Sequence, residues 1–233
     1  NTYATNWKDR PYTVRRIGED NESFSANIQM DALHMGAELE VAYKMSRFLT
    51  IEGMISLGDW RWQSKKDSIT FLDNAGNTIT DATGNIQYAS FDARGVHVGD
   101  AAQTQMGAKV RVNITKRLYV KSQYTWFDRN YSNFEPGGLT GENAGRESWR
   151  MPSYGLMDLH AGYGFPLKTM GEKGRTPYLN FRVSVLNLLN EIYIADAQNN
   201  DRFTQSFNNF DAQSASVFYG LGRRFNVSVQ LQF

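Results

Sequence analysis

The sequence lacks cysteine, has only five prolines among its 233 residues, and shows no excess of either charge, with 25 Lys and Arg against 24 Asp and Glu. The absence of cysteine excludes disulfide frameworks, thiol catalysis and Cys-ligated metal sites. The balanced charge, without a basic block, argues against nucleic acid as a partner. The longest apolar run is four residues, Ile192–Ala195, whereas a transmembrane helix needs about 20.

Aromatic residues make up 13% of the chain, and apolar residues alternate with polar ones over long stretches. Between positions 35 and 43, the odd positions are apolar and the even positions include Glu38 and Glu40. A period of two predicts strands with one apolar face and one polar face. The same alternation recurs at 106–114, 118–126, 157–165, 179–185 and 225–233.

The pattern predicts an all-β chain with about eight antiparallel strands, several of them longer than the roughly five or six residues usual in soluble proteins. Tilted strands of about 9–11 residues cross a membrane, and short turns that alternate with long polar loops are typical of outer-membrane barrels. We therefore predict an antiparallel transmembrane β-barrel in the bacterial outer membrane. The predicted strands span 1–8, 24–44, 47–62, 101–114, 117–130, 153–166, 177–194 and 216–233. The short turns are 44–47 and 115–117, and the long loops are 9–23, 63–100, 131–152 and 195–215, with an extra hairpin expected within 67–91.

The two faces of such strands carry different residues. Aromatic side chains gather at strand ends, as expected of belts at the two membrane interfaces. The predicted interface aromatics are Trp7, Tyr43, Trp60, Trp62, Trp126, Phe165 and Tyr193. The polar positions predict a charged wall facing the lumen, formed by Glu38, Glu40, Glu52, Lys109, Arg111, Lys121, Asp158, His160 and Arg182.

Residues that could carry chemistry show no catalytic or metal-binding pattern. The three histidines, His34, His97 and His160, lie on different predicted elements and lack ligand spacing. Glu38 and the carboxylates near it could act as an acid–base pair of the kind that glycosidases use. Barrel walls that face a lumen also carry such charges, and we favour this second interpretation. The run 196–201 lacks the ordered spacing of a calcium loop. We expect no enzymatic activity, metal or cofactor, and we regard the aromatic, Asn-rich loop 203–210 as a candidate ligand contact.

Three segments, in this order, resemble the C-terminal part of a TonB-dependent outer-membrane receptor, and their amino-acid sequences are similar to those of Bacteroidota receptors. The segment 36–43, followed by a turn and 48–52, is similar to a late hairpin of those barrels. The segment Val185–Tyr193 resembles the penultimate-strand motif N-L-F-N/D-x-x-Y, with a leucine in place of the phenylalanine. The end, 222–233, resembles the terminal strand with its final aromatic residue.

The resemblance implies a barrel of about 22 strands, of which these would be the last eight, and an N-terminal plug domain outside these residues. It implies import of a scarce nutrient such as a siderophore, glycan or peptide, powered by the TonB complex through the plug. Implied partners are outer-membrane lipid, a surface lipoprotein, and the barrel-assembly machinery. This machinery would recognise the terminal strand through Phe225 and Phe233. Because Asn1–Trp7 already reads as a strand in progress, we expect a fragment or a processed chain.

Two alternatives stay open at this stage. Eight strands can close a barrel whose interior holds only side chains, so the chain could be a complete small outer-membrane protein with a structural or adhesion role. The charged ladder would then form its polar core. The second alternative is a soluble or secreted β-barrel that binds a ligand.

Overall fold

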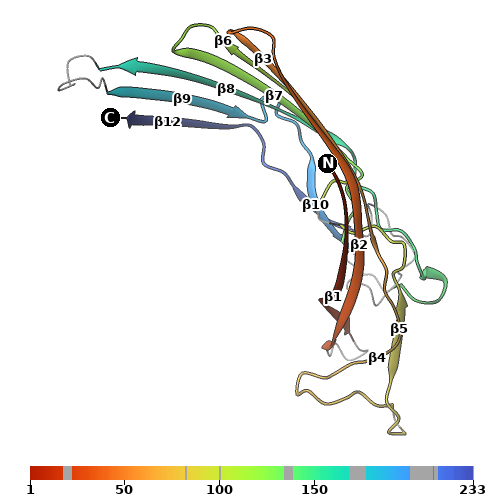
Figure 1. Cartoon of the computed structure of the whole chain (residues 1–233). Helices are drawn as coiled ribbons and strands as arrows, with labels where there is room; N and C mark the ends of the chain where they lie inside the picture. The colour runs from red at the N-terminus through yellow and green to blue at the C-terminus, as the bar shows by residue number, and fades with distance from the viewer. Residues whose placement is uncertain are drawn as a thin grey trace.

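The computed structural model describes residues 1–17, 23–81, 83–99, 101–133, 139–167, 177–199, 212 and 215–232. Figure 1 shows a single curved sheet that forms a wall, with a smaller two-stranded ribbon extending beyond one end. None of the described residues forms a helix long and apolar enough to cross a membrane.

The wall is an eight-stranded antiparallel sheet, which confirms the all-β class and the number of main strands. Its strands, in spatial order, are β1 (Thr2–Ile17), β2 (Ser23–Lys44), β3 (Leu49–Trp62), β6 (Thr104–Asn113), β7 (Leu118–Asp128), β8 (Tyr154–Pro166), β9 (Tyr178–Leu186) and β12 (Arg224–Gln232). Two ribbons complete the described strands: β4 (Lys65–Thr70) with β5 (Tyr88–Asp92), and β10 (Ile194–Asn199) with β11 (Ala215–Tyr219). Among the described residues, one 3-10 turn, η2, spans Gly141–Asn143.

The sheet is open within the described residues. β1 and β12 form its two borders, and the described strand pairs do not join one to the other. The tight connections β2–β3 and β6–β7 lie at one end, which we call the short-turn end, and the long insertions lie at the opposite, long-loop end. The predicted barrel is therefore observed as a wall rather than as a closed cylinder.

Partners across the ladder share a face, so the register separates an apolar face from a polar face. One row of the apolar face consists of Tyr43, Ile51, Val110, Ser122, Leu159, Val185 and Phe225. The neighbouring row, one residue earlier on β2, points to the polar face. It consists of Ala42, Glu52, Lys109, Gln123 and Asp158. The alternation that predicted each strand thus continues across the whole sheet.

The apolar positions of β2 change face along the strand. From 35 to 43 they are odd, but Ala26, Ile28, Met30 and Ala32 are even and buried. These even positions continue the polar face toward the long-loop end, where the insertion 63–103 covers them. The resulting core also contains Trp62, Ile69, Phe71, Phe91, Ala93, Val96, Val98 and Leu139. Where its apolar positions change face, β2 therefore leaves the part of the sheet with an exposed apolar face and enters an ordinary hydrophobic core.

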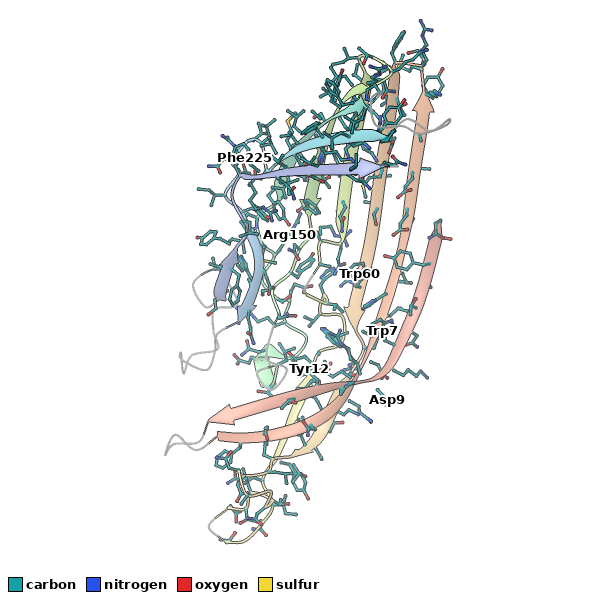
Figure 2. The ribbon with its side chains drawn as sticks, turned by 90° about the vertical axis from the view of Figure 1, so that its left-hand side faces the viewer. Trp7, Asp9, Tyr12, Trp60, Arg150 and Phe225 are labelled. Atoms are coloured by element: carbon teal, nitrogen blue, oxygen red, sulfur yellow. The ribbon has the colours of Figure 1, made fainter. Side chains whose placement is uncertain are left out.

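Several predicted boundaries are wrong, each for a local reason. β1 extends to Ile17 instead of ending near position 8, because its residues pair with β2 as far as Ser23 after a bulge between Trp7 and Arg10. A bulge increases strand bending, and Figure 2 shows β1 turning near Asp9. The predicted strand 177–194 ends at Leu186, and β10 lies almost entirely within the predicted loop 195–215. The predicted strand 216–233 is divided into β11 and β12. An extra hairpin does form in this region, but β4 pairs with β5 at 88–92, whereas the expected second arm, 77–80, forms only isolated bridges.

Candidate functional site

The polar face of the sheet is the candidate site. The register places all nine residues of the predicted charged wall on this one face, although they come from β2, β3, β6, β7, β8 and β9. These residues are Glu38, Glu40, Glu52, Lys109, Arg111, Lys121, Asp158, His160 and Arg182. The alternation alone was sufficient to find them, because a strand cannot change its side-chain period without a bulge.

An open hollow of about 580 Å³ lies in the middle of this face, lined by Glu40, Glu52, Met54, Lys109 and Gln123, with Gly107 and Ala42 among the small residues. Lys109 and Glu52 form an ion pair across the β3–β6 ladder. Because the two charges neutralise each other, the hollow presents a wet, polar surface with little net charge apart from Glu40. Such a wall suits the passage or packing of polar groups.

A stack of three rings lies on the polar face between the hollow and the long-loop end. His34 lies between Trp7 and Trp60, with ring centroids 5.5 Å and 5.3 Å apart. The indole Nε1 of Trp60 donates a hydrogen bond of 2.9 Å to the hydroxyl of Tyr3, and its backbone N–H donates to Gln103 Oε1 at 3.0 Å. Figure 2 shows Trp7 and Trp60 beside the bend of β1, with Phe225 on the far border of the sheet.

A second stack joins the other side of the face. The ring of Tyr154 packs between Phe127 and Tyr193, with centroid separations of 4.9 Å and 4.3 Å. Phe127 is paired with Gln105 of β6, which in turn is paired with Ser56 of β3. Both stacks therefore border the same polar face, and together they form an aromatic rim around its long-loop end.

These stacks correct part of the predicted interface belts. Trp7, Trp60 and Trp62 share the polar-face register with His34 and Ala32, and Trp62 is buried in the long-loop core. Tyr193 packs on Tyr154 of the polar face. These four residues therefore do not belong to the apolar surface. The remaining three, Tyr43, Trp126 and Phe165, do lie on the apolar face, as does Phe225, whereas Phe233 lies outside the described residues.

The segment Asn187–Tyr193 has a clear structural role. Asn187 and Asn190 have positive φ, at 51° and 55°, which ends β9 and redirects the chain. The buried side chain of Asn187 accepts a hydrogen bond from the N–H of Glu191 and donates to the carbonyls of Glu191 and Leu221. The ring of Tyr193 covers Gly220, where an added Cβ would lie 1.9 Å from the ring. The motif thus ties β9 to β12 at the long-loop end.

A polar network joins the two long loops 63–103 and 131–152. Glu147 accepts a hydrogen bond of 2.9 Å from the backbone N–H of His97, and its other oxygen lies 2.6 Å from His97 Nδ1. The buried imidazole stacks on Tyr131 at 4.1 Å, and its Nε2 approaches Asp59 at 3.5 Å without forming a hydrogen bond. Alternation did not reveal His97, because its partners are 38 and 50 residues away.

Further contacts stiffen the same loops. The guanidinium of Arg94 donates to Asp92 at 2.6 Å and lowers the pKa of that carboxyl to about 2. The carbonyl of Asp92 accepts the N–H of Gly145, and its N–H donates to the carbonyl of Leu139, a core residue. At the loop tip, a hydrogen bond from the Thr83 hydroxyl contributes most to lowering the pKa of Asp81 to about 2. The long-loop end is therefore a structured cap rather than a set of independent loops.

We expect Glu147→Ala to loosen this cap. The change removes the carboxylate that binds both the ring and the N–H of His97, and hydrogen bonds to charged groups contribute about 1.5–3 kcal/mol each. Hydrogen exchange at the His97 amide should therefore accelerate by at least roughly tenfold. The control is Glu142→Ala, in the same loop but exposed in η2. Equal exchange in the two variants would contradict the role of Glu147.

The described residues contain no group of three or more His, Cys, Asp or Glu side chains arranged to hold a metal ion. Of the predicted oxygen-rich run 196–201, the side chain of Asp196 accepts the N–H of Ala197, and its last two residues lie outside the described part of the chain. The candidate ligand loop 203–210 also lies outside it. No protein-family model matches the sequence, and no curated protein matches it either.

Proposed function

We propose that this chain is part of the wall of a large outer-membrane β-barrel, the C-terminal portion of a TonB-dependent receptor that imports a scarce nutrient. The observation that carries the proposal is the open eight-stranded sheet, with one apolar face exposed and one charged face. The resemblance of the three segments 36–52, 185–193 and 222–233 to such receptors supplies the family.

The apolar face supports a lipid environment. Large apolar side chains protrude from it along β2, β3, β6, β7, β8, β9 and β12; Leu39 is 60% exposed and Val227 is 68% exposed. Soluble monomers rarely expose continuous apolar patches larger than a few hundred Å². In a bilayer the same face would contact hydrocarbon, and Tyr43, Trp126 and Phe165 would contribute to the aromatic belts.

The borders of the sheet support a large barrel over a small one. An open sheet edge does not occur within the hydrocarbon region, because unpaired backbone groups there cost several kcal/mol each. A complete eight-stranded barrel would join β1 to β12, and the described residues do not pair in this way. Additional strands on both borders would satisfy these edges, as in a barrel of about 22 strands.

In this proposal the polar face lines the lumen, and the cap at the long-loop end faces the outside of the cell. The aromatic rim and the cap would form part of the vestibule that captures the nutrient. Energy would come from the TonB complex through a plug domain, and a surface lipoprotein would serve as a lid. The chain itself would act as wall and vestibule without enzymatic chemistry.

The test is the denaturing mass of the native protein, purified from outer membranes of its source. We expect a polypeptide several times heavier than 26.5 kDa, which is retained by the immobilised periplasmic domain of TonB. A mass near 26.5 kDa without a co-purifying second chain would contradict the proposal and favour the complete small barrel. A heavy chain that TonB does not retain would contradict the energy coupling but not the large barrel.

A further inference from the structure

Charge is segregated along the polar face. The acidic residues Glu38, Glu40 and Glu52 lie on β2 and β3, at one side of the sheet, and Asp158 lies in β8. The described stretches 44–51, 110–122, 160–167, 177–185 and 225–232, which cover the β2–β3 and β6–β7 turns, the end of β8 and most of β9 and β12, contain no Asp or Glu. Those stretches instead carry seven cations: Lys44, Arg47, Arg111, Lys116, Arg117, Lys121 and Arg182.

Among the described residues, none of these seven cations forms an ion pair. The ion pairs formed by described residues involve other cations, such as Lys109 with Glu52 and Arg150 with Asp128. Arg111 donates a hydrogen bond of 3.1 Å from Nε to Asn113 Oδ1 and also lies 4.0 Å from the ring of Tyr119. Arg47 lies over the ring of Phe48, at 4.5 Å. Like charges that gather on one surface repel one another, so a bound anion would stabilise this end of the sheet.

A hollow of about 240 Å³ lies among these cations, lined by Lys116, Arg117, Tyr119, Asn180 and Arg182; we call it the basic pocket. Its floor is formed by Gly162 and Gly164 of β8. The register explains the space, because Gly162 lies between Tyr119 and Arg182, and the N–H of Gly164 donates to the carbonyl of Arg117.

The glycine floor places cations on both sides of an open strip. Neighbouring strands are about 4.8 Å apart, so the backbones that carry Arg117 and Arg182 are separated by roughly two strand spacings, or about 10 Å. A Cβ at Gly162 would lie 2.3 Å from the Tyr119 ring, so the ring packs directly on this floor. The guanidinium of Arg111 lies over the same ring.

We infer that the basic pocket binds the oxyanion group of a small molecule, a phosphate or a carboxylate. Guanidinium groups match both oxyanions with paired N–H donors, and the Tyr119 hydroxyl and Asn180 amide add neutral donors. The central hollow contains its own Glu52–Lys109 pair, whereas the described lining of the basic pocket includes Lys116, Arg117 and Arg182 and no acidic residue. The size of the pocket suits one such group with water rather than a folded segment.

The test is calorimetric titration of the purified full-length protein in detergent at low ionic strength, where screening is weakest. The probes are inorganic phosphate and citrate, in separate titrations. We expect saturable binding of at least one probe, and about tenfold weaker binding in each of Arg182→Gln and Lys116→Gln. The stronger probe then distinguishes a phosphate-bearing ligand from a carboxylate-bearing one.

The matched control is Lys44→Gln, which removes the same charge at the same end of the sheet but outside the basic pocket. It should change binding less than about twofold. If it weakens binding as much as Arg182→Gln does, the effect is diffuse attraction and the inference is wrong. Absence of saturable binding below about 10 mM of either probe also overturns it. Lys116 lies in an exposed turn, so its variant remains informative even if Arg182→Gln misfolds. Equilibrium binding does not depend on transport.

Discussion

Asn187→Ala is expected to lower the free energy of unfolding by about 3 kcal/mol. The side chain is 3% exposed and forms three hydrogen bonds, at 2.8, 2.9 and 3.3 Å, to backbone groups of Glu191 and Leu221. Alanine would leave buried groups without partners, which costs about 1–3 kcal/mol each. It would also be strained at the φ of 51° that Asn187 adopts. The measurement is guanidinium unfolding of the full-length protein in detergent.

Asn187→Gly separates the two causes. Glycine accepts a positive φ but forms none of the side-chain bonds, so this variant should be about 1 kcal/mol more stable than Asn187→Ala. The matched control is Asn190→Gly. That residue is exposed, has a similar φ, and its side chain accepts a single hydrogen bond from Arg223. If Asn187→Ala and Asn190→Gly are equally stable, the buried amide does not join β9 to β12 as argued.

Phe91→Ala is expected to destabilise the cap by about 3–5 kcal/mol, the usual cost of truncating a buried phenylalanine. Phe91 is 2% exposed in a core shared by Met30 of β2, Trp62 of β3 and Leu139 of the next loop. Because this core lies at the long-loop end, beyond the part of the sheet with an exposed apolar face, the loss should be local. We expect the insertion 63–103 to open while the sheet remains paired.

Limited trypsin digestion measures this opening, because Lys65 and Lys66 precede Phe91 within the insertion and are exposed. Cleavage there should accelerate by about a hundredfold or more, in proportion to the open population. The control is Tyr88→Ala, an aromatic truncation in the same strand β5 at a position that is 61% exposed. Similar cleavage of the two variants would show that the core does not hold the insertion.

The charged wall was predictable from the sequence, whereas the aromatic belts were only partly so. Trp60 and Trp62 occupy even positions, as Glu52 does, and so belong to the polar face. Because they are aromatic residues at a strand end, the sequence pattern instead predicts that they belong to a membrane-interface belt. The missed signal is the change of apolar positions in β2, from even at Ala32 to odd at Met35. That change marks where the wall ends and the cap begins.

The contacts that close the cap were beyond sequence reasoning. His97 and Glu147 lie 50 residues apart, and neither belongs to an alternating segment. The same holds for the basic pocket, whose Arg117 and Arg182 come from different hairpins. Their proximity depends on the register of β8 between β7 and β9, and on Gly162, which leaves room for the Tyr119 ring to pack against the sheet.

The sequence by itself determined that the chain forms long antiparallel strands with an apolar and a polar face, because side-chain alternation is a local property of an extended backbone. The tertiary structure alone decided the open borders of the sheet, the position of the aromatic stacks, the cap, and the basic pocket. Each of these depends on which strands lie side by side and in which register. Pairing between residues far apart in the chain is set by the packing of the whole sheet.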